Sequence, residues 1–191
     1  MSKKFVSTYF NFLCLIAMLF VLAIVAAPQS KKERRQAEQL VQDGNKAFNQ
    51  KNYRTAIDDY TKSIAIVPAS PAAHYWKGYS HYNLKEFDDA VRELDIAMSQ
   101  GFKPLDVYRV RSMSRYEKKD FDGALADFRE GLKLEPDNQM FLRGVGAVTY
   151  AQGNFTESLN AYPLALAKDP TNADLYYQLS SIEYKLQDTA G

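Results

Sequence analysis

The feature that most constrains this chain is a pattern of side chains that repeats every 34 residues. One position of the pattern holds a small residue each time: Gly44, Gly78, Ser112, Gly146 and Ser180. A second small position holds Ala56, Ala90, Ala124 and Ser158. Two aromatic positions hold Phe48, Tyr82, Tyr116, Tyr150 and Tyr184, and Tyr53, Phe87, Phe121 and Phe155. A period of this length is typical of arrays of stacked helical hairpins.

Each unit predicts a helix A, a short polar turn and a helix B. Apolar residues follow the 3.6-residue period of an amphipathic helix, as at Ala124, Leu125, Phe128 and Leu132. Three units end at a proline, which disfavours helix in the residue before it: Pro68, Pro136 and Pro170. The second unit lacks this proline. There Gly101 predicts a left-handed helix cap, and Pro104 opens the next unit.

These repeated positions resemble the tetratricopeptide repeat (TPR) family over the chain from residue 37 onward. The units span residues 37–70, 71–104, 105–138 and 139–172, and residues 173–187 form a lone capping helix. The resemblance implies an all-α solenoid, a right-handed superhelix of helix-turn-helix repeats, with the A helices lining an inner groove. Small residues would let paired helices approach closely, while aromatic residues fill the layer between units. The cap should show water a polar face, made by Gln178, Ser181, Lys185 and Gln187.

The N-terminal part predicts a transmembrane signal anchor at residues 9–28, after a short basic tail at 1–8 and before a basic linker at 29–36. No charged residue occurs between residues 5 and 30, and a bilayer span takes about 20 residues. A cleaved signal peptide is an alternative, because Val25, Ala26 and Ala27 resemble a cleavage site. The length of the apolar run and the position of Pro28 favour an uncleaved anchor; a buried soluble helix is a third alternative.

The basic residues around this span bear on its orientation. Lys3 and Lys4 precede it, whereas Lys31, Lys32, Arg34 and Arg35 follow it. Because cytoplasmic flanks carry more Lys and Arg, this favours a single-pass membrane protein with a cytoplasmic repeat domain. A periplasmic or lumenal repeat domain is the alternative. The free amino terminus adds a positive charge to the N-terminal flank of the span, which favours keeping that flank in the cytoplasm.

Composition argues against several functions for the repeat domain. Residues 36–191 carry 18 Lys and Arg against 22 Asp and Glu, a net charge of −4, so we expect no nucleic-acid binding. His74 and His81 are two helical turns apart, about 10.5 Å, which is too far to share a metal ion. The sequence contains no phosphate-binding loop and no nucleophile motif. We therefore predict a protein that is not an enzyme and binds no cofactor.

The resemblance assigns ligand-facing positions on each helix A, close to its small residue. These positions are Val41, Gln42, Asn45, Tyr75, Trp76, Tyr79, Arg109, Val110, Met113, Arg143, Gly144 and Ala147. The predicted peptide-binding groove consists of Asn45, Tyr75, Trp76, Tyr79, Arg109, Met113 and Arg143. The two arginines could grip a carboxylate or phosphate, and the aromatic residues could supply an apolar anchor. The alternative is that these residues only pack between repeats, or pair with nearby charges such as Asp106.

One well-defined TPR function can be tested directly on the sequence. Members that bind the C-terminal carboxylates of cytosolic heat-shock chaperones use a clamp of Lys, Asn, Asn, Lys and Arg on three A helices. Asn45 matches the second member of this clamp. The other four places hold Val41, Trp76, Asp106 and Val110. We therefore predict no clamp-type chaperone binding.

The sequence therefore predicts a non-catalytic adaptor, in which a membrane-tethered TPR groove binds a peptide segment of an unidentified partner protein. Such a partner could be a subunit or an assembly client of a membrane complex. The alternative is a structural subunit of a membrane-associated complex, which packs through its outer faces and has no groove ligand.

Overall fold

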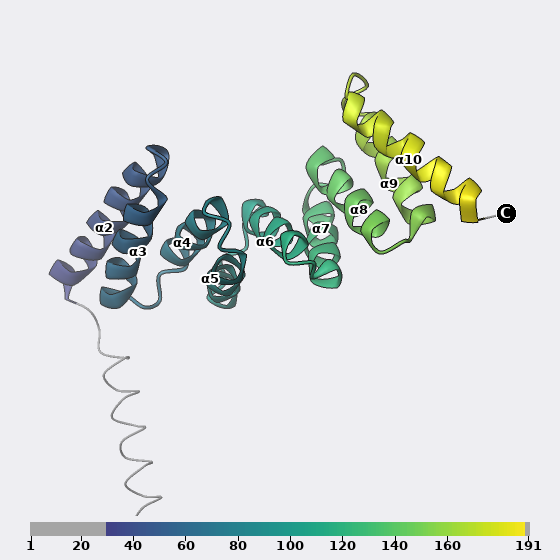
Figure 1. Cartoon of the computed structure of the whole chain (residues 1–191). Helices are drawn as coiled ribbons and strands as arrows, with labels where there is room; N and C mark the ends of the chain where they lie inside the picture. The colour runs from purple at the N-terminus through teal and green to yellow at the C-terminus, as the bar shows by residue number, and fades with distance from the viewer. Residues whose placement is uncertain (1–29, 190–191) are drawn as a thin grey trace, which may run out of the picture.

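The computed structural model describes residues 30–189, with side chains to residue 187, and this part of the chain is entirely α-helical (Figure 1). Its helices are α2 (Lys31–Asn49), α3 (Tyr53–Ile66), α4 (Pro71–Asn83), α5 (Phe87–Ser99), α6 (Leu105–Glu117), α7 (Phe121–Leu134), α8 (Gln139–Ala151), α9 (Phe155–Leu166) and α10 (Ala173–Thr189). The even-numbered helices are the A helices and the odd-numbered ones the B helices. Consecutive hairpins stack side by side into an extended array, which confirms the predicted all-α repeat fold.

The predicted membrane span at residues 9–28 and the basic tail at 1–8 lie outside the described residues. Within residues 30–189, none of the helices combines the length and the apolar character that crossing a bilayer requires.

The predicted basic linker at residues 29–36 is wrong for most of its length, because α2 already begins at Lys31. Ser30 caps this helix: the Glu33 amide donates to Ser30 Oγ at 3.2 Å, and the Ser30 amide donates to Glu33 Oε2 at 2.7 Å. This reciprocal capping box satisfies two backbone donors that a helix end leaves unpaired. The basic segment therefore extends the first helix A towards the N-terminus.

The small residue of each helix A lies where its partner helix B comes closest. A Cβ atom on Gly44 would lie 2.6 Å from Tyr60 Cε1, and one on Gly146 would lie 2.9 Å from Tyr162 Cε2. Ser112, the equivalent residue of the third repeat, is fully buried. These contacts confirm the predicted close approach of paired helices.

The aromatic positions pack within each repeat as well as between repeats. The rings of Phe48 and Tyr53 lie 5.3 Å apart, and the later repeats form the same pair at 6.0, 5.8 and 5.5 Å. Each pair joins the end of a helix A to the start of its own helix B. The same column also contacts the next repeat: the Phe48 ring lies 5.2 Å from that of Trp76, and the Tyr150 hydroxyl lies 3.1 Å from Ser181 Oγ. These contacts confirm the predicted packing of aromatic residues between units.

The turns between helices A and B share one backbone geometry. Their central residues Lys51, Lys85 and Lys119 have φ between 60° and 62°, and Gly153 has φ 76°. Such left-handed conformations are unfavourable for residues with a Cβ atom. Gly101 has φ 88°, which confirms the left-handed cap predicted for the second repeat.

The capping helix α10 is less polar than predicted. Leu175 and Ile182 are buried against α9, and Lys185 and Gln187 are exposed as expected. However, Tyr176, Tyr177 and Tyr184 are also exposed, at 52%, 72% and 66%. The last helix therefore shows aromatic as well as polar surface to solvent.

Candidate functional site

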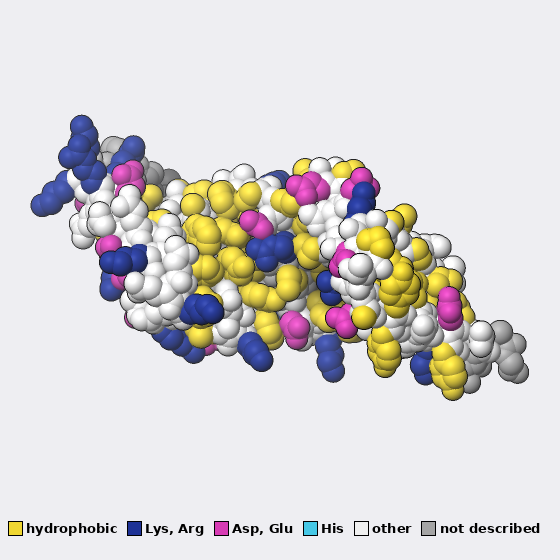
Figure 2. Space-filling view, turned by 90° about the horizontal axis from the view of Figure 1, so that it is seen from above, with side chains coloured by type: hydrophobic (Ala, Val, Ile, Leu, Met, Phe, Trp, Pro, Cys, Tyr) yellow, Lys and Arg dark blue, Asp and Glu magenta, His cyan; other side chains and the backbone are white. Residues whose placement is uncertain are grey.

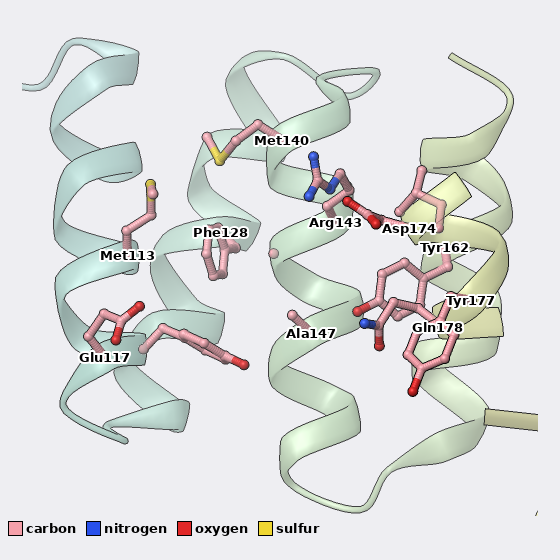
Figure 3. A pocket seen from close by; sticks show the side chains of 13 residues that line it. Met113, Glu117, Phe128, Met140, Arg143, Ala147, Tyr162, Asp174, Tyr177 and Gln178 are labelled. Atoms are coloured by element: carbon pink, nitrogen blue, oxygen red, sulfur yellow. The ribbon is translucent and has the colours of Figure 1, made fainter. Parts of the chain in front are cut away.

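A groove of about 500 Å³ opens between α6, α8 and α10 (Figure 3). Met113 of α6 and Met140 and Ala147 of α8 are among the side chains that line it. Phe128 of α7 and Tyr162 of α9 also contribute to its lining, although both are almost fully buried. The groove thus has apolar walls contributed by the A helices and an aromatic base contributed by the B helices.

The base of the groove depends on a glycine. A Cβ atom on Gly144 would lie 2.3 Å from Phe128 Cε1, so only glycine lets this ring reach the space beneath α8. Gly144 is one of the predicted ligand-facing positions. Its function in the structure is to admit Phe128 rather than to offer a side chain of its own.

The charged residues of the groove are Arg143, Glu117 and Asp174 (Figure 3). Arg143 is exposed, and it forms no salt bridge or hydrogen bond with any residue in the part of the chain that the structure describes. Burial raises the pKa of the Tyr162 hydroxyl to about 12, and the charge of Arg143 partly opposes that rise. The guanidinium of Arg143 is therefore available to an acidic ligand group.

A second surface feature, the aromatic patch, consists of Phe48, Trp76, Tyr79 and Tyr82. The ring of Phe48 lies 5.2 Å from that of Trp76 and 5.0 Å from that of Tyr79, and Tyr79 lies 6.2 Å from Tyr82. All four side chains are half-buried. Figure 2 shows hydrophobic side chains gathered on this face in the middle of the array, over the region of α4 and α6.

Tyr75 and Val110 do not face a ligand as predicted. Tyr75 is 4% exposed, because its ring packs against Trp76 and Phe102, and Val110 is fully buried in the same core cluster. Tyr75 therefore supports the aromatic patch from beneath, and it is not part of the accessible surface.

Arg109 is occupied by internal contacts. Its Nε donates to Asp106 Oδ1 at 2.8 Å, and its guanidinium lies 5.2 Å from the centre of the Tyr79 ring. Burial lowers the pKa of Arg109, but hydrogen bonds and charge interactions with Asp106 and Tyr79 together raise it by more, so the net shift is upward. The predicted pair of equivalent arginines is thus not equivalent: Arg109 is held at the aromatic patch, whereas Arg143 lies in the groove.

The remaining predicted site residues fall in different places. Asn45 accepts a hydrogen bond from the Tyr60 hydroxyl at 2.8 Å, which ties α2 to α3. Met113 lies between the two surfaces, since it lines the groove and its Sδ is 3.9 Å from the Tyr82 hydroxyl. The structure therefore brings Met113 and Arg143 to the groove, and Trp76 and Tyr79 to the aromatic patch.

The prediction missed the part of the groove that α10 contributes, Asp174, Tyr177 and Gln178. The signal was present in the sequence. Ser180 is the small residue of a fifth helix A, and the offset that gave Arg143 from Gly146 gives Tyr177 from Ser180. The prediction gives α10 only the role of a cap, so it assigns these residues no part in the groove.

One cluster within residues 30–189 has the composition of a metal site: His81, Glu86 and Asp89, whose ligand atoms all lie within 4.8 Å of one another. Glu86 already binds His81 Nδ1 at 2.8 Å and Arg54 Nη2 at 2.5 Å. The guanidinium of Arg54 supplies the positive charge that a metal ion would bring. The cluster is accounted for as a polar link between the first two repeats.

The comparisons with known proteins agree with this architecture. The sequence model of the tetratricopeptide repeat family matches residues 42–98 and 110–190. Small glutamine-rich tetratricopeptide repeat-containing protein 2 of Saccharomyces cerevisiae is 30% identical over 58% of this chain and 32% of its own length. RNA polymerase II-associated protein 3 of Mus musculus is 30% identical over 52% of the chain and 15% of its own length. The chain thus spans a third or less of these relatives.

Solved structures that are similar to it include the following two. YrrB, described as a TPR protein with an unusual peptide-binding site, has a TM-score of 0.76 at 16% identity, covering 82% of this chain and 80% of YrrB. The first TPR domain of Spaghetti (RPAP3), bound to the HSP90 peptide SRMEEVD, has a TM-score of 0.59 at 27% identity, covering 62% of this chain and 94% of that domain. The family match extends over more than half of the chain, and the chain belongs to the tetratricopeptide repeat family.

Proposed function

We propose that this protein is a non-catalytic adaptor that is tethered to a membrane by residues 9–28 and binds a segment of a partner protein in the groove between α6, α8 and α10. The observation that carries the proposal is the position of Arg143. An exposed cation stands at the rim of an apolar groove and has no acidic partner among the described residues. A related domain, the first TPR of RPAP3, binds a peptide, which supports a peptide as the ligand class.

The groove suggests what the peptide should contain. Met113, Met140 and Phe128 offer a site for one apolar or aromatic side chain, the kind of anchor that dominates binding energy at protein interfaces. Arg143 would bind an acidic group next to that anchor. Glu117 and Asp174 also line the groove, so a run of several acidic residues would meet repulsion there.

The same geometry argues against clamp-type binding of chaperone tails. Of the positions that a clamp would use, Val110 is buried in the core, Asp106 is paired with Arg109, and Trp76 belongs to the aromatic patch. None of these three side chains offers a free cation or amide to a carboxylate.

The membrane tether defines where the partner would be found. A protein confined to one bilayer meets partners in that bilayer at a raised effective concentration, which suits a subunit or an assembly client of a membrane complex. The charge pattern around residues 9–28 favours a cytoplasmic repeat domain. Protease treatment of sealed vesicles tests this orientation. In vesicles whose cytoplasmic side faces outward, added protease should cut the repeat domain, and in vesicles of the opposite orientation it should leave the repeat domain intact.

Site-specific crosslinking tests the groove. A photoreactive residue in place of Met113, in the full chain in its native membrane, should crosslink a partner that a photoreactive residue in place of Lys133 does not. Lys133 is exposed on α7 and does not line the groove, so it is a matched control. Arg143→Glu should abolish the Met113 crosslink, whereas Lys133→Glu should leave it unchanged. A structural subunit without a groove ligand would instead form crosslinks from positions on its outer faces, and Arg143→Glu would leave those crosslinks unchanged.

A further inference from the structure

The capping helix α10 has one side that no part of the described chain covers. This side, here called the end face, consists of Tyr176, Ser180, Glu183, Tyr184 and Gln187, which follow one stripe of the helix. All five residues are exposed, and the Tyr176 hydroxyl donates to the Pro170 carbonyl at 3.2 Å. Figure 1 shows α10 at the end of the array, with α9 packed on it from one side.

The other A helices show what normally covers these positions. The residues equivalent to Ser180 are Gly44, Gly78, Ser112 and Gly146. In each repeat this position is buried, and in the first, second and fourth repeats a large side chain of the repeat's own helix B lies against it. For example, a Cβ on Gly78 would lie 2.9 Å from Leu94 Cγ. Ser180 keeps the same small size, yet nothing in the described chain packs against it.

Tyr184 repeats this relationship for the aromatic position. Its equivalents are Phe48, Tyr82, Tyr116 and Tyr150, and each of them pairs with the first aromatic ring of its own helix B at 5.3 to 6.0 Å. Tyr184 is 66% exposed. The end face therefore retains both features that hold a helix B in the preceding repeats.

We propose that the end face binds an amphipathic helix of a partner protein, in the place that α3, α5, α7 and α9 take on their own A helices. The four internal examples define the pattern of that helix. Its first residue is aromatic, its fourth is small and its eighth is large and apolar, as in Phe121, Ala124 and Phe128 of α7. The large residue would lie over Ser180, and the first aromatic ring would pair with Tyr184.

Charge narrows the choice of occupant further. The residues equivalent to Glu183 in the second and third repeats are His81 and Arg115, which bind the N-cap carboxylates Glu86 and Asp120 at 2.8 and 3.7 Å. Glu183 reverses the sign at this position, so the occupant carries Lys or Arg at its N-cap. The positive end of a helix dipole adds to this attraction. The same reversal disfavours α5 or α7 of a second copy, because their N-caps are acidic.

A designed peptide tests the proposal without an identified partner. The probe has the sequence of residues 119–135 with Asp120→Lys, held helical by a side-chain lactam on the face away from Phe121 and Phe128. Binding to the full chain in detergent micelles is measured by fluorescence anisotropy. We expect saturable binding, weakened at least about tenfold when the peptide keeps Asp120 or carries Phe128→Ala.

Protein variants locate the binding surface. Ser180→Trp should weaken the peptide at least about tenfold, because it fills the space of the large residue, and Glu183→Lys should reverse the preference at the peptide's N-cap. Both residues are exposed, so the thermal unfolding midpoint should stay close to that of the wild type. Arg143→Glu and Tyr177→Ala change the groove and should leave this binding unaffected, which separates the end face from the proposed groove function.

Two results would overturn the proposal. One is a peptide that does not bind, or that binds equally well to the Ser180→Trp variant. The other is self-association of the full chain that Ser180→Trp abolishes, because the end face would then belong to a second copy.

Discussion

Arg111 and Asp127 form a buried ion pair between the two helices of the third repeat: Arg111 Nε donates to Asp127 Oδ2 at 2.9 Å, and Asp127 is 2% exposed. The second repeat has an ion pair at the same two positions, where Lys77 Nζ lies 2.9 Å from Glu93 Oε1. The fold thus uses one site between helices A and B for a charge pair in two successive repeats.

The fourth repeat fills this site with Val145 and Ala161, which belong to one apolar core cluster. Arg111 and Arg115 both bind Asp127, and the position of Arg115 holds Thr149 in the fourth repeat. Asp127→Ala should therefore lower the free energy of unfolding by about 3–5 kcal/mol, because both arginines lose a buried partner. The triple variant with Arg111→Val, Arg115→Thr and Asp127→Ala copies the fourth repeat and should recover most of that loss. Urea unfolding of both variants measures the difference. A triple variant no more stable than Asp127→Ala would show that the two repeats do not share this site.

The turn between α2 and α3 offers a stabilising substitution. Lys51 has φ 60°, whereas its neighbour Gln50 has φ −81°. Lys51→Gly removes the strain of a left-handed residue with a Cβ atom and should raise the free energy of unfolding by about 1 kcal/mol. Gln50→Gly is the control, and it should lower stability because it only adds flexibility to the unfolded chain. Equal effects of the two substitutions on the thermal midpoint would contradict this explanation.

The close approach of paired helices can be tested by comparing two equivalent positions. Gly146→Leu places a side chain where a Cβ alone would lie 2.9 Å from Tyr162, so it should destabilise the fold by about 1–3 kcal/mol or more. Ser180→Leu makes a similar change at the exposed equivalent position on α10 and should alter stability by less than about 0.5 kcal/mol. Thermal unfolding of both variants provides the comparison.

The fold could be predicted from the sequence because single residues mark the helix contacts and the turns. Small residues at Gly44 and Gly146 mark the close contacts, and Gly101 marks a turn whose φ only glycine adopts easily. The start of α2 is also encoded in the sequence, in the spacing of Ser30 and Glu33, although the basic composition of this segment predicts a linker.

The candidate site was harder to predict. Residues at equivalent positions of different repeats lie on the same side of their helices, but they have different neighbours. Tyr75 and Arg143 occupy the same place in their repeats. Tyr75 is buried by the rings of Trp76 and Phe102, whereas the groove beside Arg143 is lined by the small residues Gly144 and Ala147. The exposure of a side chain depends on the size of the neighbouring side chains, including those on other helices. The position of a residue within its repeat does not reveal these neighbours.

Stability should depend on pH through Glu93, which is 5% exposed. Burial raises the pKa of this carboxyl, but hydrogen bonds and charge attraction from His74 and Lys77 together lower it by more, so the net shift is below the usual value of 4.5. The folded protein therefore binds this proton less tightly than the unfolded chain. The stabilisation is present above about pH 4.5 and is lost as the pH falls through the lower folded-state pKa.

Urea unfolding between pH 3 and pH 7 tests this dependence. Glu93→Gln should be less stable than the wild type at pH 7, and the difference should shrink as the pH falls below about 4.5. Glu130→Gln, an exposed residue of α7, is the control and should track the wild type throughout. A difference between wild type and Glu93→Gln that stays constant with pH would rule out a role for the Glu93 charge.

The chaperone peptide SRMEEVD, which the first TPR domain of RPAP3 binds, should not bind this chain. Three of the places that a clamp would use hold the buried Val110, the paired Asp106 and the aromatic Trp76. The peptide's two glutamates, aspartate and terminal carboxylate would meet one unpaired cation in the groove, Arg143, together with Glu117 and Asp174. Isothermal titration at concentrations that saturate the RPAP3 domain measures this, and saturable binding that Arg143→Glu abolishes would show that the groove accepts a polyacidic tail after all.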